Sequence, residues 1–277
     1  MTIDEFIRSA VHEDIGDGDH TSDACIPTDA EGRARMLVKE SGVIAGVHIA
    51  EQIFYYIDSS LKVKIKVEDG TPVEAGDVVM KVSGKARSIL KAERLALNCM
   101  QRMSGIATKT RQVIDSLQGL NTKVLDTRKT TPGIRFLEKL AVKIGGGVNH
   151  RFGLYDMMMI KDNHIDFAGG IENAIHKAND YLKKENINIK IEIEVRDFEE
   201  LDQVLSIGKV DRIMLDNFSP SNLSKAIQII DHQFETEASG GITIDTIVPY
   251  AETGVDYISM GALTHSAQNF DISMVAV

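Results

Sequence analysis

The chain has 277 residues, so it forms either one large domain or two of ordinary size. Its composition, 43% hydrophobic and 26% charged, is that of a globular protein and excludes collagen-like, coiled-coil and largely disordered chains. The formal net charge of −10 argues against binding to nucleic acid or to anionic membranes, because both require a basic surface.

Three features of the sequence indicate a reduced, cytoplasmic protein. No apolar run approaches the roughly 18–20 residues of a membrane-spanning helix. The start of the chain, Met1 to Phe6, is acidic and lacks the basic and apolar regions of a signal peptide. Cys25 and Cys99 are too few and too far apart for a disulfide framework or a CxxC site.

Residues 1–85 are expected to form short strands and turns with one helix, a small α+β layer. Residues 33–39 form the first expected strand, residues 62–67 alternate with period two, and residues 76–84 form a further strand between glycines. The segment from His12 to His20 is rich in metal-binding side chains, but it has neither an HExxH motif nor the glycine spacing of an EF-hand. We therefore predict an exposed acidic loop there.

A long helix is predicted over residues 86–117, because apolar residues recur at helical spacing and form one stripe. Gly105 lies inside this helix at a cost of about 1 kcal/mol relative to alanine, which predicts a bend or close packing. We place the boundary between two domains there. The first domain spans 1–105, with residues 266–277 expected to return to it, and the second spans 106–265.

From residue 120 onward, strands and helices alternate, which predicts a parallel sheet with right-handed crossovers. The expected strands are 123–126, 157–160, 190–195, 212–215, 235–238 and 257–260. About 145 residues are too few for an eightfold barrel of about 250 residues. A reduced α/β barrel of about six strands is the preferred architecture, and an open doubly wound sheet is the alternative.

Polar or glycine residues follow every one of these strands. In parallel α/β folds, ligands bind at the carboxyl ends of the strands, so these residues are expected to share one rim. The basic candidates, suited to carboxylates or phosphates, are Arg128, Lys129, His150, Arg151 and Lys161. Residues 121–165 hold eight basic and four acidic side chains, a local net charge of +4 in an acidic chain. The sequence therefore predicts a pocket for a small anion.

Carboxylates and glycines complete the predicted rim. Glu194 and Asp216 come from the ends of adjacent strands. Two carboxylates in this place could bind Mg²⁺, which would also be held by substrate phosphates, or they could stabilise a sugar cation that develops during glycosyl transfer. Strand alternation places Glu192 and Glu194 on one face, which favours a polar barrel lumen over an exposed edge. Ser239, Gly240, Gly241 and Gly261 follow the last two strands, where barrels often bind phosphate.

Nine motifs together resemble the quinolinate phosphoribosyltransferase family over nearly the whole chain. They are Glu13-Asp-Ile-Gly-x-Gly-Asp19, Asn98-x-x-Gln-Arg-x-Ser-Gly-Ile-Ala-Thr108, Leu125-Asp-Thr-Arg-Lys-Thr-Thr-Pro-Gly133, Gly145-Gly-Gly-Val-Asn-His-Arg-Phe-Gly-Leu154, Met159-Ile-Lys-Asp-Asn-His164, Glu192-Ile-Glu-Val195, Leu215-Asp-Asn-Phe218, Glu237-Ala-Ser-Gly-Gly-Ile-Thr243 and Ser259-Met-Gly-Ala-Leu-Thr264. Leu140 departs from the pattern, since an aromatic residue is expected there.

The resemblance implies an N-terminal open α/β sandwich, a C-terminal reduced barrel and a homodimer in which Arg102 reaches the partner's site. It implies a pentosyltransferase of NAD biosynthesis, which transfers phosphoribosyl from phosphoribosyl pyrophosphate to quinolinate with decarboxylation. The basic residues named above would hold the two carboxylates of quinolinate, with Lys129 and Lys161 also catalytic. Glu194 and Asp216 would address the ribose and Mg²⁺, and Thr127, Ser239, Gly240, Gly241 and Gly261 would contact substrate, chiefly the 5-phosphate.

Three other hypotheses remain open at this point. A phosphoribosyltransferase-like protein associated with molybdenum use shares the fold and several motifs, although the complete set of cations favours a dicarboxylate. Lys161 at a strand end would also suit a Schiff-base aldolase. A non-catalytic module that binds phosphosugars would bind phosphoribosyl pyrophosphate without releasing CO₂.

Overall fold

The computed structural model describes residues 2–277, which form two compact units. Of the described residues, the first unit comprises 2–112, 130–146 and 263–277, and the second comprises 113–129 and 147–262. Within residues 2–277, no helix has the length and apolar character needed to cross a membrane.

The first unit is built on a four-stranded antiparallel sheet in the order β12-β1-β5-β3. These strands are β1 (Glu31–Val38), β3 (Lys62–Ile65), β5 (Val78–Lys85) and β12 (Ile272–Ala276). Two further strands, β2 (Gly42–Val43) and β4 (Pro72–Val73), pair with each other. β12 pairs with β1, with Met36 opposite Met274. A strand from the C-terminal part of the chain therefore belongs to the same sheet as the first strand.

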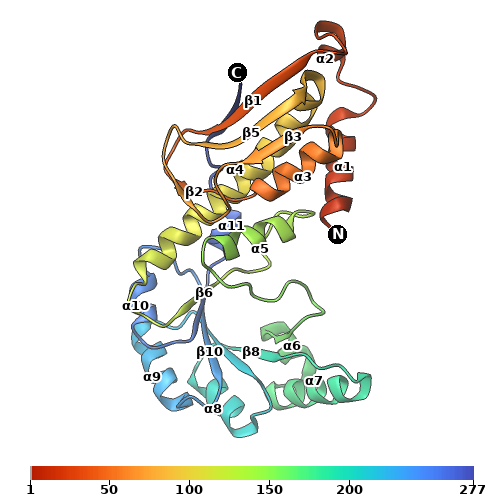
Figure 1. Ribbon diagram of the computed structural model, residues 1–277. Helices are drawn as coiled ribbons and strands as arrows, with labels where there is room; N and C mark the ends of the chain where they lie inside the picture. The colour runs from red at the N-terminus through yellow and green to blue at the C-terminus, as the bar shows by residue number, and fades with distance from the viewer. Residues whose placement is uncertain (1) are drawn as a thin grey trace. The chain divides into compact units, whose positions relative to one another are not determined.

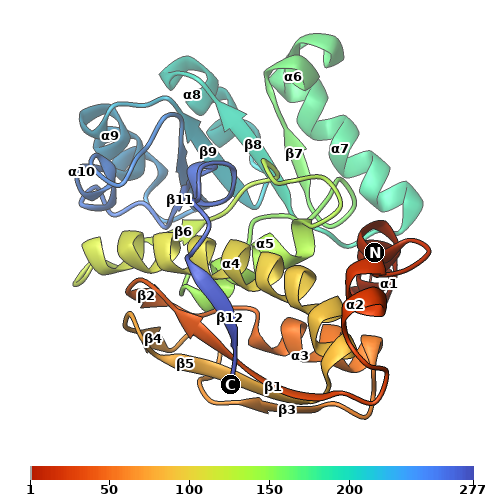
Figure 2. The same ribbon diagram turned by 90° about the horizontal axis from the view of Figure 1, so that it is seen from above.

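Helices α3 (Val47–Ile57) and α4 (Ala86–Ser116) lie along one face of this sheet (Figure 2). α4 confirms the helix predicted over residues 86–117, and its apolar stripe is buried, with Ala92 and Met103 fully so. Close packing explains Gly105: a Cβ there would lie 1.9 Å from the carbonyl oxygen of Gln268. The 130–146 segment, which contains α5 (Arg135–Ile144), also belongs to this unit.

The acidic loop predicted from His12 to His20 is confirmed only for residues 16–19, because helices occupy both ends of the segment. Residues 3–15 form α1, whose first turn is closed by a capping box between Thr2 and Glu5, and residues 20–25 form α2, capped by Asp19. The capping signals outweigh the charge pattern on which the loop was predicted. The His20 and Asp17 side chains are almost fully exposed and 3.9 Å apart, so they form no buried metal site.

The second unit is a curved, six-stranded parallel sheet in the order β6-β11-β10-β9-β8-β7 (Figure 1). Its strands are β6 (Lys123–Leu125), β7 (Met158–Ile160), β8 (Ile191–Val195), β9 (Arg212–Asp216), β10 (Glu235–Ser239) and β11 (Tyr257–Ser259). All six predicted strands are confirmed to within two residues. Residues 2–277 contain no ladder between β6 and β7, so the reduced barrel is open between these two strands.

Helices follow the strands and cover the outside of the sheet. They are α6 (Asp162–Ala168), α7 (Ile171–Glu185), α8 (Phe198–Ile207), α9 (Pro220–Ile230) and α10 (Ile247–Ala251). The short helix α11 (Ala262–His265) follows β11, and its residues 263–265 already belong to the first unit. On β8, Ile191, Ile193 and Val195 are buried, and Glu192 and Glu194 between them are buried as well. This burial on both faces confirms the polar lumen predicted from the alternation of β8.

Candidate active site

The sheet of the second unit carries ten of the thirteen predicted site residues to its carboxyl edge. Because the six strands are parallel, the residues that follow them emerge on the same side. These residues are Thr127, Arg128, Lys129, Lys161, Glu194, Asp216, Ser239, Gly240, Gly241 and Gly261. Pairing of Ser239 with Asp216, the last residues of β10 and β9, fixes the two strand ends side by side.

His150 and Arg151 arrive on a segment that runs beside β6. Val148 forms a parallel bridge with Leu125, and its N–H donates to the carbonyl of Val124 at 2.8 Å. The His150 N–H donates to Oδ1 of the fully buried Asp126, also at 2.8 Å. Sequence reasoning did not identify Asp126 as a site residue, although its place directly after β6 was a usable signal.

The guanidinium groups of Arg128 and Arg151 carry like charges that act on each other. Burial lowers the pKa of Arg151, and the positive charge of Arg128 lowers it further. Arg151 is oriented by a hydrogen bond of 3.2 Å from its Nη1 to the carbonyl of Met157. Like charges held together in a partly buried place favour the binding of an anion between them.

Lys161 and Glu194 form an ion pair between the ends of β7 and β8. The Glu194 side chain is only 10% exposed, whereas that of Lys161 is 41% exposed. The ion pair holds the Lys161 side chain beside Glu194 at this edge of the sheet.

The ends of β9 and β10 meet in a close backbone contact. Gly240 has a φ of +106°, and a Cβ there would lie 2.2 Å from Oδ1 of Asn217. Asn217, itself at a φ of +56°, donates its N–H to the Ser239 carbonyl at 2.8 Å and its side-chain amide to Asp216 at 2.6 Å. Asn217 was not among the predicted site residues, although it directly follows Asp216.

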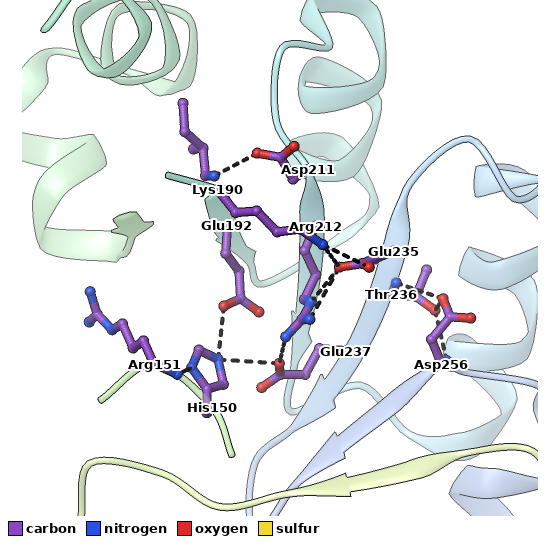
Figure 3. Close-up of polar contacts among 11 residues, drawn as sticks. His150, Arg151, Lys190, Glu192, Asp211, Arg212, Glu235, Thr236, Glu237 and Asp256 are labelled. Carbon is purple, nitrogen blue, oxygen red and sulfur yellow. Dashed lines mark hydrogen bonds and ion pairs between the residues drawn. The ribbon is translucent and has the colours of Figure 1, made fainter. Parts of the chain in front are cut away.

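Beneath this edge, a cluster of charged side chains fills the lumen (Figure 3). The Nε2 atom of His150 lies 2.9 Å from Glu192 and 3.3 Å from Glu237, and both carboxylates are fully buried. Arg212 contacts Glu237 at 3.1 Å and stacks over the ring of Tyr257, 4.1 Å from its centroid. Glu237 and Arg212 were missed from sequence, although alternation along β9 and β10 places them on the same face as Asp216 and Ser239.

The two buried glutamates titrate differently. Burial and the adjacent charge of Glu237 raise the pKa of Glu192 to about 7. Burial alone would raise the pKa of Glu237 too, but hydrogen bonds from His150, Glu192 and Ser259 lower it below its usual value. Glu237 is thus the ionised member of the pair.

Among residues 2–277, the three donors His150, Glu192 and Glu237 are the only histidine, cysteine or acidic set gathered tightly enough for a metal ion. Nδ1 of His150 accepts a hydrogen bond of 2.6 Å from the Arg151 N–H, which leaves the proton of a neutral ring on Nε2. A protonated Nε2 faces the two carboxylates at ion-pair distance and cannot bind a metal, and Arg212 already neutralises Glu237. We therefore interpret this cluster as a network of ion pairs.

Arg102, on α4, belongs to the first unit. Its Nε and Nη2 donate to the buried carboxylate of Glu138 at 3.0 and 2.7 Å, and its other hydrogen bonds reach the carbonyls of Thr264 and Ala267. Its side chain is 22% exposed. The predicted role of Arg102 in a partner's site stays a prediction.

The chain is similar to known proteins along almost its whole length. Residues 19–104 match the family model of the N-terminal domain of quinolinate phosphoribosyl transferase, and residues 106–275 match that of its C-terminal domain. The chloroplastic carboxylating nicotinate-nucleotide pyrophosphorylase of Arabidopsis thaliana is 47% identical over 97% of this chain and 81% of its own length. A protein of Bacillus subtilis, named as the probable enzyme of the same kind, is 43% identical over 95% of this chain and 89% of its own.

Solved structures agree with these sequence matches. The nicotinate-nucleotide pyrophosphorylase of Francisella tularensis superposes with a TM-score of 0.93 at 37% identity, over 99% of this chain and 96% of that one. The corresponding protein of Ehrlichia chaffeensis also gives 0.93 at 37% identity, over 100% and 99% of the two chains.

Proposed function

Because this chain belongs to the quinolinate phosphoribosyltransferase family, we propose that it transfers phosphoribosyl from phosphoribosyl pyrophosphate to quinolinate. The products are nicotinate mononucleotide, pyrophosphate and CO₂, a step in the biosynthesis of NAD. One observation supports this function above the others: Arg128, Arg151 and Lys161 share an edge of the sheet with Glu194 and Asp216. That set suits two polyanionic substrates and a developing positive charge.

The basic residues form the quinolinate half of the proposed site. Arg128 and Arg151, whose positive charges act on each other, are suited to a carboxylate that separates them. Lys129 and Lys161 add two ammonium groups that hold and orient the second carboxylate. His150 belongs to the same half of the site and stands at its buried side.

The acidic and glycine residues form the phosphoribosyl half. Ser239, Gly240, Gly241 and Gly261 follow β10 and β11, where glycines let backbone N–H groups approach the 5-phosphate, and Thr127 adds a hydroxyl near the same edge. Glu194 and Asp216, at the ends of β8 and β9, face the ribose. Their negative charge stabilises the cation that develops at C1 of the sugar.

In the proposed reaction, the ring nitrogen of quinolinate attacks C1 while the bond to pyrophosphate breaks. The ring carbon next to that nitrogen then loses its carboxyl group as CO₂ and keeps the electron pair of the broken bond. The positive ring nitrogen stabilises this carbanion, which takes up a proton from a lysine ammonium or from water. Arg128, Arg151 and Lys161 are already in place, so little reorganisation is needed as the charges move.

We also propose Mg²⁺ as the metal cofactor. Glu194 and Asp216 supply the carboxylate oxygens that this ion prefers, but among residues 2–277 they do not gather with a third acidic residue or histidine. Magnesium commonly binds one or two carboxylates and completes its shell with substrate phosphates and water, which fits this donor set. When bound, the ion would neutralise the departing pyrophosphate.

The proposed assembly is a homodimer in which Arg102 serves the partner's site. Glu138 fixes the Arg102 side chain while leaving part of it exposed, which suits a preorganised contact. Mixing Arg102→Ala with Lys161→Ala subunits should restore activity, since each hybrid dimer would hold one intact site. Absence of recovery in verified mixed dimers would contradict a shared site.

We propose that the chain acts in the cytoplasm, with Cys25 and Cys99 both free thiols. Some plant relatives are named as chloroplastic or mitochondrial. Fractionation of the source cells, followed by immunoblotting, tests the location.

The deciding experiment is to incubate the purified chain with quinolinate, phosphoribosyl pyrophosphate and Mg²⁺ and to measure CO₂ and pyrophosphate together. Equal amounts of the two are expected. Binding of phosphoribosyl pyrophosphate without either product would instead support the non-catalytic module. Borohydride trapping of a sugar phosphate on Lys161 would support the aldolase, and no turnover of quinolinate in a folded protein would leave the molybdenum-associated relative as the better hypothesis.

A further inference from the structure

His150 is held from inside the barrel. Its ring lies between the strands β8 and β10, where Nε2 is 2.9 Å from Glu192 and 3.3 Å from Glu237 (Figure 3). The ring is 5% exposed and both carboxylates are fully buried. Two central strands of the sheet therefore hold a side chain that belongs to the segment beside the edge strand β6.

The backbone on both sides of this ring is fixed as well. The His150 N–H donates to Asp126 at 2.8 Å, and the N–H of the next residue, Arg151, donates to Nδ1 of the His150 ring at 2.6 Å. Both ring nitrogens thus have partners within the chain. In this arrangement the ring has no nitrogen directed at a bound carboxylate, whereas the adjacent Arg151 guanidinium lies within the electrostatic reach of Arg128.

Arg212 supports the carboxylate of Glu237 from below. Its Nη1 lies 3.1 Å from Glu237, and its Nη2 lies 3.1 Å from Glu235 near the start of the same strand. Stacking on Tyr257 fixes the guanidinium plane. A carboxylate bound by His150 on one side and by Arg212 on the other has little freedom to turn.

We propose that Glu192 and Glu237 are positioning residues that act on quinolinate through His150 and Arg151. The two glutamates anchor the imidazole ring of His150. The ring and Asp126 then fix the backbone at residues 150 and 151, and this backbone directs Arg151 toward a carboxylate of the substrate. The inference deepens the proposed function and depends on it. His150 then acts by holding the segment rather than by contacting quinolinate.

The test is a kinetic comparison of Glu237→Gln and Glu192→Gln with the unchanged chain. Each substitution keeps the shape of the side chain and replaces its carboxyl group by a neutral amide. We expect KM for quinolinate to rise roughly 10–100-fold, the range seen when an outer partner that orients a ligand is removed. KM for phosphoribosyl pyrophosphate should change by less than about twofold, because its proposed half of the site lies at other strand ends.

A matched control is Thr236→Val on the same strand. Thr236 is also buried, but its hydroxyl contacts Asp256, outside the His150 network. This variant should leave KM for quinolinate unchanged. An equal rise in Thr236→Val and Glu237→Gln would overturn the proposal, because the effect would then come from general disturbance of β10.

The route through Arg151 is tested with a double variant. Adding Glu237→Gln to Arg151→Ala should raise KM for quinolinate by less than about twofold more, since the group being positioned is already gone. Independent, multiplying effects would contradict the inference. If Glu237→Gln fails to fold, the same comparison is made with Glu192→Gln, introduced into the unchanged chain and into Arg151→Ala. His150→Gln is a third variant for which the same change in KM is expected. An unchanged chain that turns over no quinolinate would refute the proposed function instead.

Discussion

The ammonium of Lys161 lies against the carboxylate of Glu194 and joins the carboxyl ends of β7 and β8. The pair brings together one residue from each half of the proposed site. The Glu194 side chain is almost buried, so it depends on Lys161 for a neutralising partner.

Replacing Lys161 by alanine should lower kcat/KM on the order of 10²–10³-fold, because one preorganised cation is lost from a site for anions. It should also lower the free energy of unfolding by roughly 1–3 kcal/mol, since Glu194 is left without its partner. Steady-state kinetics and urea unfolding measure the two effects. Lys177→Ala is the control, because the Lys177 side chain is exposed and its ammonium donates to the carbonyl of Ala168. Activity should be unchanged in this variant.

Gly240 and Gly241 provide a matched pair of substitutions. Both have positive φ, but a Cβ at Gly240 would lie 2.2 Å from Asn217, whereas nothing lies within 4 Å of a Cβ at Gly241. Gly241→Ala should therefore cost about 1–2 kcal/mol of unfolding free energy from backbone strain alone. Gly240→Ala should cost about 1–3 kcal/mol more from overpacking and raise KM for phosphoribosyl pyrophosphate. Equal unfolding midpoints for the two variants would contradict this reading of the contact.

Much of the second unit could be predicted from sequence because its signal is local. Each strand, such as residues 191–195, is a short apolar or alternating run, and parallel topology then requires that Lys161, Glu194 and Asp216 share one edge. The hydrogen-bonding partners within that edge could not be predicted. The contact of His150 with Glu192 and Glu237 depends on which side chains meet across the lumen, and sequence spacing does not fix that.

The first unit was harder to predict for a related reason. The helix at residues 3–15 was missed although Ile3, Ile7 and Val11 recur at helical spacing and its capping box was present in the sequence. α5, at residues 135–144, packs with the first unit although it follows the first barrel strand, and that placement depends on distant partners. Gly145 is an example, since a Cβ there would lie 2.5 Å from the carbonyl of Ala107.

The stability of the chain should fall as the pH rises from about 6.5 to 9. Burial lowers the pKa of His150, but hydrogen bonds to Glu192 and Glu237 outweigh it and raise the pKa to about 9. The second proton of the ring would occupy Nδ1, so the Arg151 N–H that donates to Nδ1 must release this atom when the ring becomes charged, and it opposes the rise. Arg212 and Asp126 are the other charged groups near the ring. A raised pKa means that the folded state holds a proton that the unfolded state has released above about 6.5.

The contribution is therefore complete below pH 6.5 and lost by pH 9, at a size on the order of 1–3 kcal/mol. Urea unfolding at half-unit pH intervals measures the slope. His150→Gln, which cannot titrate, should flatten it. An equally steep slope in this variant would assign the pH dependence to other groups.

The two thiols should differ in reactivity. Cys25 is exposed, whereas burial raises the pKa of Cys99 to about 12. Because only the thiolate is alkylated, iodoacetamide at pH 8 should modify one thiol in the folded chain and two in urea. Intact-mass spectrometry counts the additions, and rapid modification of Cys99 in the folded chain would show that it is accessible.

The antiparallel pairing of β1 with β12 has a consequence for synthesis. The outer strand of the N-terminal sheet is supplied by residues 272–276, so that sheet cannot be completed until the ribosome has translated the whole barrel. Nascent chains that already contain every residue of the second unit would still expose the open flank of β1. Chaperones that recognise unpaired strands could bind the chain during this interval. A ribosome stalled just before residue 272 would hold the chain in that state.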